Sequence, residues 1–452
     1  MTTLHIETAL LPTGWARDVR IVLDGDIIQS VTPDTPLERR DERHAIAIPG
    51  ISSVHSHAFQ RGMAALAEVR GSSTDTFWTW REAMYRFVLA LSPEQMEAVA
   101  RLLYVEMLEA GFTRVGEFHY LHHDRDGSPY ANLGEMAERI AAAATATGIG
   151  LTLLPCFYAH ATFGGVPPHP GQRRFINSVD QFARLVEASR QAIRHVPGAN
   201  LGVAPHSLRA VTPDELKAVV ALGGDAQVHI HAAEQVKEVE DCVAWCGQRP
   251  VEWLLANMPV DKRWCLIHAT HMTRTETSAL ARSGATAGLC PITEASLGDG
   301  IFPAREFKAE GGVFAVGTDS NILVGVTDEL RQLEYGQRLR FRERNVLAGS
   351  EDISTGRALF DNVVAGGVAA LAQGGTGLAA GQPADIVTLD GVHPSLMARR
   401  GDVILDGWIF AGGRDAIDCV WANGIKVVQG GRHHLRDQAR RAYNTALMDL
   451  MP

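Results

Sequence analysis

The sequence lacks the features that mark membrane-spanning, secreted or nucleic-acid-binding chains. Residues 140–172 contain no Asp, Glu, Lys or Arg, but glycines and prolines interrupt them, whereas a spanning helix needs about 20 mostly apolar residues. No basic stretch followed by an apolar segment stands at the N-terminus, so we expect no signal peptide. The net charge is −10 and Lys and Arg form no long run, which disfavours nucleic acid as a partner.

Cysteine is also scarce. The six cysteines are scattered and form no paired motif, which in a chain of this size favours reduced, mostly buried thiols and a cytoplasmic location. Hydrophobic residues make up 46% and charged residues 21% of the chain, a composition typical of a folded protein with a large core. Its 452 residues fit three domains of about 150 residues, or one barrel of about 250 residues with a smaller domain.

Both ends of the chain have the pattern of short β-strands. An Asp-Gly pair at 24–25 and an Asn-Gly pair at 423–424 each separate two apolar stretches, which is a strong local signal for a β-hairpin. The same pattern at both ends predicts a small β-sandwich domain built from residues 1–48 and 377–452.

Residues 49–376 alternate short apolar runs with helical stretches, the pattern of a parallel sheet covered by helices. Two expected helices begin with good capping pairs, Ser-Pro at 92–93 and Thr-Pro at 212–213. Eight runs match the strand number of a (β/α)8 TIM-like barrel, although a doubly wound sheet also fits the alternation. The runs span residues 51–58, 114–120, 150–159, 200–208, 226–234, 263–270, 285–294 and 312–320.

Polar side chains gather at the carboxyl ends of several runs, where β/α barrels build their active sites. His55 and His57 are two residues apart, so on a strand they share one face. His231, His268 and Asp319 stand at matching strand ends. Two imidazoles from one strand, a third from another strand and one carboxylate make a four-ligand site with room for water. The pattern therefore predicts a metal centre at the barrel mouth.

Several neighbouring residues lie outside this set. His229 shares a face with His231, but His231 is nearer the strand end, so we take His231 as the ligand and expect His229 deeper or behind it. Other residues near the site are interpreted as packing or wall residues. These are Trp78, Trp80, Cys290 and Glu294.

The order of these residues resembles the amidohydrolase superfamily, in which an HxH pair follows strand one, histidines follow strands five and six, and an aspartate follows strand eight. Binuclear members carry a carboxylated lysine on strand four, but residues 200–208 contain no lysine. We therefore expect one divalent metal ion, with zinc as the first choice. His231 and Glu234 resemble the HxxE element of the superfamily's deaminases, which implies C–N hydrolysis with release of ammonia. The superfamily also implies a homodimer.

A closer resemblance, to the N-formimino-L-glutamate deiminases, rests on residues 55–61 (HSHAFQR), 76–82 (TFWTWRE), 116–124 (GEFHYLHHD) and 204–209 (APHSLR). It implies metal-dependent hydrolysis of N-formimino-L-glutamate to N-formyl-L-glutamate and ammonia, a step of histidine degradation. The implied roles are metal binding by His55, His57, His231 and Asp319, proton transfer by Glu234, His268 and Asp319, and substrate contact by Gln60, Arg81, Tyr120, His206 and Arg209.

The chemistry of a small dicarboxylate substrate suits two of these residues. Arginine binds carboxylates bidentately, so Arg81 and Arg209 match the two carboxylates of formiminoglutamate. Two alternatives stay open. Another deaminase of the superfamily, acting on a purine, pyrimidine or related heterocycle, would use the same metal set but needs no pair of arginines. A barrel kept only as a binding or assembly scaffold should have lost at least one of the ligands, and none is missing.

Overall fold

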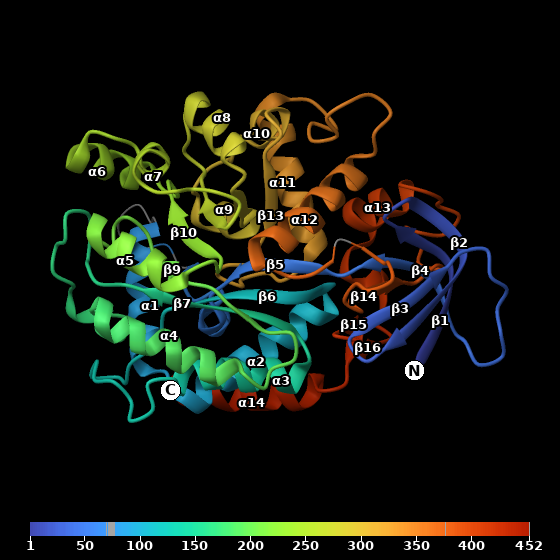
Figure 1. The fold of residues 1–452 in the computed structure, drawn as a ribbon, viewed down its shortest axis with the longest axis horizontal. Helices are drawn as coiled ribbons and strands as arrows, with labels where there is room; N and C mark the ends of the chain where they lie inside the picture. Colours follow the sequence, from blue (N-terminus) through green and yellow to red (C-terminus); the bar gives the residue numbers. More distant parts are fainter. Residues whose placement is uncertain (69, 71–76, 376, 452) are drawn as a thin grey trace.

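The computed structural model describes residues 1–68, 70, 77–375 and 377–451. Thr76, in the segment 76–82, Thr376, at the predicted boundary between the barrel and the small domain, and Pro452 lie outside the described residues. The helices and the central strands form a barrel, and the strands from the two ends of the chain lie together beside it (Figure 1).

Eight parallel strand positions form the barrel, and they match the eight predicted runs. Two sheets, β5 to β9 and β10 to β13, are joined by a parallel bridge between Ser56 and Asp319 and by further bridges from the β9 region to β10. The (β/α)8 expectation is therefore confirmed. The strands are β5 (Ile51–Ser56), β6 (Phe112–His119), β7 (Gly150–Phe157), β8 (Asn200–Leu201) with β9 (Ala204–Pro205), β10 (Val228–Ala232), β11 (Trp264–His268), β12 (Thr286–Leu289) and β13 (Val313–Val316).

Two runs differ from the continuous strands that the sequence suggested. The fourth is split into β8 and β9 at Gly202 and Val203, whose N–H groups donate to carbonyls on opposite neighbours, Leu153 on β7 and Gln227 just before β10. The seventh ends at Leu289, because Pro291 starts a helix, where its missing N–H costs nothing. That early end moves Glu294 from a strand onto a helix.

Helices surround the barrel and cover its strands (Figure 1). Both predicted caps are confirmed, since Ser92 and Thr212 form capping boxes at the starts of two helices. The helices are α1 (Phe77–Ala90), α2 (Pro93–Glu109), α3 (Glu135–Thr147), α4 (Val179–Ile193), α5 (Pro213–Gly223), α6 (Val236–Cys246), α7 (Pro250–Asn257), α8 (Arg274–Ser283), α9 (Pro291–Leu297), α10 (Ala304–Ala309), α11 (Val326–Phe341) and α12 (Thr355–Leu371).

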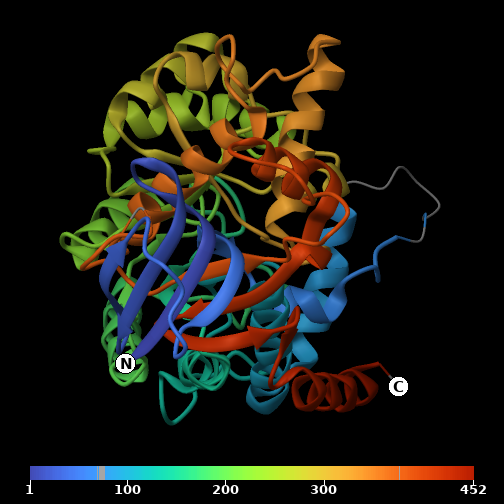
Figure 2. The same cartoon turned by 90° about the vertical axis from the view of Figure 1, so that its right-hand side faces the viewer.

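Strands from both ends of the chain share one curled sheet, in the order β17-β16-β15-β14-β4-β1-β2-β3 (Figure 2). Both predicted hairpins are present, joining β2 to β3 and β15 to β16. The helix α14 (Arg436–Leu450) leaves this sheet and packs on α2 of the barrel. The strands are β1 (Thr2–Leu11), β2 (Gly14–Asp24), β3 (Ile27–Thr32), β4 (Glu42–Pro49), β14 (Ile386–Leu389), β15 (Ile417–Ala422), β16 (Ile425–Gln429) and β17 (Arg432–His433). A short helix, α13 (Val403–Gly407), precedes β15.

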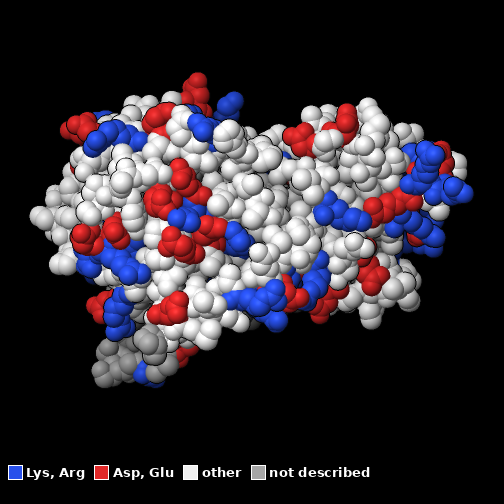
Figure 3. All heavy atoms as spheres, turned by 90° about the horizontal axis from the view of Figure 1, so that it is seen from below, with Lys and Arg blue, Asp and Glu red and all other residues white. Residues whose placement is uncertain are grey.

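The segment 140–172, which contains no charged residues, forms the end of α3, the buried strand β7 and an irregular loop. In the described part of the chain, none of the helices has the length and hydropathy to span a bilayer. All six cysteines are free and five are buried. On the face in Figure 3, acidic and basic side chains are interspersed.

Candidate active site

Four predicted ligands converge at the carboxyl end of the barrel. His55 lies on β5, His57 directly follows it, His231 lies on β10, and Asp319 follows β13. Each of these four residues offers one possible ligand atom, and the four atoms all lie within 4.8 Å of one another. The Nε2 atom of His55 is 3.2 Å from His57 Nε2, 3.1 Å from His231 Nε2 and 3.4 Å from Asp319 Oδ1.

The hydrogen bonds behind these rings decide which nitrogen atoms face the centre as lone pairs. His57 Nδ1 donates to the Phe118 carbonyl and His231 Nδ1 to the His206 carbonyl, each at 2.9 Å. Because a carbonyl only accepts, the hydrogen is on Nδ1, and burial lowers the pKa of both rings, which favours a lone pair on each Nε2 atom. Burial, with a smaller contribution from His57, lowers the pKa of His55 to about 3, so this ring is neutral as well.

Buried lone pairs that face one another repel unless a cation lies between them. Tetrahedral zinc, with Zn–N bonds of about 2.0–2.1 Å, separates its nitrogen ligands by roughly 3.3 Å, close to the spacing here. The donor set of three imidazoles and one carboxylate therefore fits a divalent ion that keeps room for a water molecule.

His268, the last residue of β11, lies between three carboxylates beside this centre. Its Nδ1 is 3.2 Å from Glu294 Oε1, and its Nε2 is 3.7 Å from both Glu234 Oε1 and Asp319 Oδ2. Burial opposes the charged ring, but Glu234, Glu294 and Asp319 together raise the pKa of His268 to about 10. The buried Nε2 has no hydrogen-bond partner among the described residues, so it can exchange a proton with a bound reactant.

Glu294 is therefore more than the wall residue that the sequence suggested. Its Oε1 also accepts the Cys290 N–H at 2.8 Å, which holds the carboxylate against His268. The only sequence signal for this contact is the position of Glu294 just beyond the seventh run, because the turn at Pro291 determines where the side chain lies.

The backbone at the two key strand ends is strained. His268 and Asp319 have φ angles of 67° and 42°, and left-handed conformations in such residues cost about 1–3 kcal/mol each. The Asp319 N–H donates to the His55 carbonyl at 3.0 Å, and Asn321 Nδ2 donates to the Asp319 carbonyl at 2.8 Å. Gly317 permits this approach, since a Cβ there would lie 2.7 Å from the His55 nitrogen.

An inner pocket opens beside the centre, and all five residues predicted to contact substrate line it. Gln60 Nε2 donates to the Tyr120 hydroxyl at 2.9 Å, while the buried Gln60 Oε1 has no partner in the described part of the chain. That oxygen is free to accept a hydrogen from a ligand. The lining includes Gln60, Arg81, Tyr120, His206, Arg209, Glu234 and His268, together with Tyr85 and Tyr158, which the sequence did not indicate.

The two arginines have different surroundings. Arg209 is buried, and its Nη2 lies 3.5 Å from Glu234 Oε2 and 3.9 Å from Glu238 Oε2. The guanidinium of Arg81 lies 4.5 Å from the centre of the Trp78 ring, and no described carboxylate forms an ion pair with it. Among the described residues, Arg209 therefore already has acidic partners, whereas Arg81 has no carboxylate partner.

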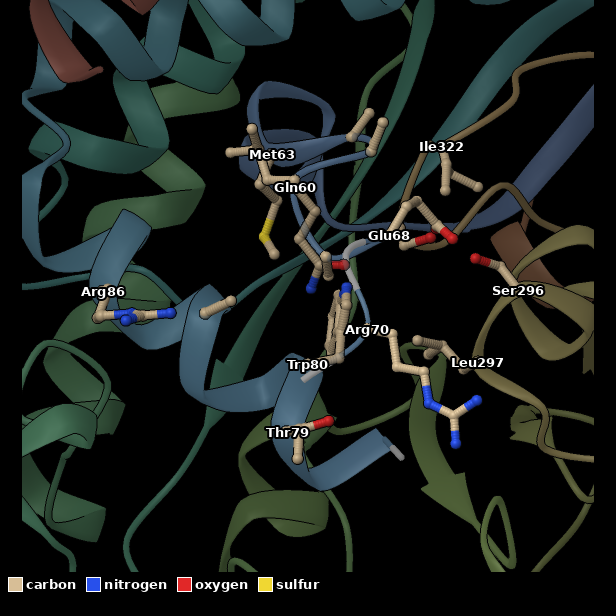
Figure 4. A pocket seen from close by; sticks show the side chains of 16 residues that line it. Gln60, Met63, Glu68, Arg70, Thr79, Trp80, Arg86, Ser296, Leu297 and Ile322 are labelled. Carbon is tan, nitrogen blue, oxygen red and sulfur yellow. The ribbon is translucent and has the colours of Figure 1, made fainter. Parts of the chain in front are cut away.

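A larger outer cavity, of about 410 Å³, adjoins the inner pocket. Gln60, Trp80 and Leu297 line both, and they come from three separate segments (Figure 4). Trp80 is therefore a wall of both cavities as well as a packing residue.

His229 lies deeper than the ligand cluster. Its Nε2 bonds to the Ala370 carbonyl at 2.8 Å, at the end of α12 and away from the mouth. This agrees with the expectation that His231 and not His229 joins the cluster.

Comparisons with known proteins extend over the whole chain. Residues 46–427 match the amidohydrolase family, and residues 1–45 match the N-terminal domain of the formimidoylglutamate deiminase HutF. The formimidoylglutamate deiminase of Pseudomonas aeruginosa is 50% identical over 100% of both chains. A crystal structure of an amidohydrolase from Brucella melitensis is 60% identical, with a TM-score of 0.96 over 100% of both chains. The atrazine chlorohydrolase TrzN of Arthrobacter aurescens TC1, complexed with zinc, has a TM-score of 0.83 at 21% identity over 100% of both chains, which shows a shared fold.

Proposed function

The chain belongs to the amidohydrolase family, and from that premise we propose that it hydrolyses N-formimino-L-glutamate to N-formyl-L-glutamate and ammonia, a deimination in histidine degradation. The observation that carries the proposal is the cluster of His55, His57, His231 and Asp319 beside Glu234 and His268, in a pocket that two arginines line. The 50% identity of the Pseudomonas enzyme over its full length supports the same substrate.

The proposed metal centre holds one divalent ion through His55, His57, His231 and Asp319. Zinc is the ion we propose, because the imidazole spacing fits its bond lengths and a protein of the same fold has been solved with zinc. Residues 200–208 supply no lysine for a second ion. When bound, the ion acts as a Lewis acid that lowers the pKa of water toward about 7.

The proton transfers fall to the residues around the ion. We assign the acceptance of the water's proton to the ionised Asp319, and the orientation of the attacking water to His268 in its protonated form. Glu234, 3.7 Å from His268 Nε2, then delivers a proton to the amino nitrogen of the attacked formimino group, so that ammonia leaves. Burial raises the pKa of Glu234 above its ordinary value, against the opposing effects of His268 and Arg209, which suits a group that must carry a proton.

The substrate contacts follow from charge. Arg81 and the buried Arg209 are assigned to the two carboxylates, since a guanidinium pairs with a carboxylate through two parallel hydrogen bonds. Gln60 Oε1, which lacks a partner in the described residues, is assigned to an N–H of the formimino head. Tyr120 holds Gln60, and His206 forms the adjacent wall.

The wider expectations also remain proposals: a division into residues 1–48 with 377–452 and residues 49–376, a cytoplasmic location and a homodimer. A deaminase acting on a heterocyclic base is the alternative function, and the two arginines disfavour it because a neutral base needs no carboxylate partners. Ammonia release from N-formimino-L-glutamate, formiminoglycine, cytosine and guanine, measured at equal concentrations, separates these functions. The proposal requires formiminoglutamate to have the highest kcat/KM, and preference for either base would overturn it.

A further inference from the structure

A buried amide on one wall of the inner pocket lies between two tyrosines. Gln172 is fully buried, and its Nε2 is 2.8 Å from the Tyr158 hydroxyl and 3.4 Å from the Tyr85 hydroxyl. Tyr85 lies on α1 and Tyr158 directly follows β7, and both line the inner pocket. Neither tyrosine has a role in the mechanism above.

The orientation of this amide is fixed by the backbone. The His169 N–H donates to Gln172 Oε1 at 3.0 Å, so Oε1 is the oxygen and the NH₂ group faces the tyrosines. An NH₂ group only donates, and both hydroxyl oxygens must therefore act as acceptors toward Gln172. Each tyrosine then has its own hydroxyl hydrogen left to donate elsewhere.

The remaining acceptors for these hydrogens are few. In the described part of the chain, no carbonyl or carboxylate oxygen accepts from the hydroxyl of Tyr85 or Tyr158. The two hydroxyls can bond to each other, which uses one hydrogen and leaves at least one. Burial raises the pKa of Tyr158, so the hydroxyl keeps its hydrogen.

The free hydrogen lies in a region of positive charge. Tyr158 interacts electrostatically with both Arg81 and Arg209, and all three side chains line the inner pocket. The two guanidinium groups supply positive charge, and the amide of Gln172 leaves the tyrosine hydroxyls free to donate. Together they form a site for an anion with several lone pairs.

We propose that Tyr85 and Tyr158 donate hydroxyl hydrogens to one carboxylate of the substrate, and that Gln172 is the positioning residue that sets this donor direction. The identity of that carboxylate as part of N-formimino-L-glutamate rests on the proposed function. The arginines supply charge, and the tyrosines add directed donors that distinguish a dicarboxylate from a monocarboxylate.

The first test removes both hydroxyls and keeps both rings. In the metal-loaded enzyme, the double variant Tyr85→Phe/Tyr158→Phe should raise KM for N-formimino-L-glutamate by at least about 10- to 150-fold, the range for the loss of one hydrogen bond to a charged group. The kcat should stay within about threefold, because the carboxylate is bound alike in ground and transition states. Tyr130→Phe, whose hydroxyl accepts from Arg174 outside the pocket, is the matched control and should leave both constants unchanged.

The second test reverses the direction of the donors. In Gln172→Glu the new carboxylate can still accept the His169 N–H, but it can only accept from the tyrosines, whose hydroxyls must turn toward it. KM should rise at least as much as in the double tyrosine variant. Once both hydroxyls are gone, adding Gln172→Glu should raise KM by a smaller factor than it does in wild type.

Monocarboxylates separate directed binding from a general disturbance of the pocket. Formiminoglycine and N-formimino-4-aminobutyrate each lack one of the two carboxylates. The compound that lacks the carboxylate bound by the tyrosines should show the same KM in wild type and in the double tyrosine variant. Equal losses on all three compounds would overturn the inference, as would an unchanged KM for formiminoglutamate.

A binding measurement keeps this inference distinct from the proposed function. Calorimetric titration with N-formyl-L-glutamate, which carries both carboxylates, should give a Kd that rises by at least about 10- to 150-fold in the double variant, the range for one lost hydrogen bond to a charged group. If wild type bound this compound but did not hydrolyse formiminoglutamate, the proposed function would fail and the carboxylate site would stand. If the variant bound it as tightly as wild type does, the carboxylate site would fail, whatever the turnover.

Discussion

Glu294 offers a direct test of how His268 is prepared for proton transfer. Glu294→Gln keeps an oxygen for the Cys290 N–H but removes the negative charge that lies 3.2 Å from His268 Nδ1. A hydrogen bond to a charged group contributes about 1.5–3 kcal/mol, and if this is used in the transition state, kcat should fall about 10- to 150-fold. KM should change little, because Glu294 does not line the inner pocket.

The assay is steady-state ammonia release at several pH values, with metal content measured on the same samples. Loss of the neighbouring anion lowers the pKa of His268, so the alkaline limb of the kcat profile should move to lower pH. Glu329→Gln is the matched control, because Glu329 is a buried carboxyl beside α9 that accepts the Ile292 N–H, does not contact His268 and has its pKa raised by burial. If Glu294→Gln kept kcat within threefold of wild type at full metal occupancy, the assignment of Glu294 to His268 would be wrong.

Four other outcomes follow from the site. Glu234→Gln should retain the metal but lose about 10²- to 10⁴-fold in kcat, and near-normal turnover would make Glu234 a spectator. Arg81→Met should lower kcat/KM for formiminoglutamate about 10- to 150-fold and spare a monocarboxylate. Arg209→Met tests substrate binding less directly, because it also removes one of the cationic neighbours of Glu234. Elemental analysis should find one divalent ion per chain and much less in His231→Ala, and two ions would contradict the mononuclear site. Burial lowers the pKa of His433 to about 4. As pH falls from about 6.5 toward 4, the unfolded chain takes up a proton that the folded chain does not, so the free energy of unfolding falls by at most about 1.4 kcal/mol per pH unit. His433→Gln should flatten this pH dependence in thermal unfolding, and an unchanged slope would exclude the linkage.

The sequence predicted the barrel because each strand is a short apolar run, and neighbouring strands of the barrel follow one another in the same order along the chain. It also predicted the ligand cluster, since the carboxyl ends of parallel strands meet at one mouth, and His55 and His57 must share a face. These inferences depend on periodicity and strand order, which local residue patterns carry.

The contacts that were missed depend on how loops turn. Glu294 reaches His268 because Pro291 starts a helix, and Gln172 reaches Tyr158 through a short 3-10 turn between β7 and α4. Nor does spacing predict that Arg209 pairs with Glu234, because strand order brings two loops together without fixing their side chains. The division into two domains stays a prediction.

The identity of the products tests the proposed reaction most directly. With N-formimino-L-glutamate labelled with ¹³C at the formimino carbon, NMR of the reaction with metal-loaded enzyme should show the label only in N-formyl-L-glutamate, with one ammonia released per turnover. Cleavage of the other C–N bond would instead place the label in formamide and release glutamate. The second result, or no turnover at full metal occupancy, would contradict the account.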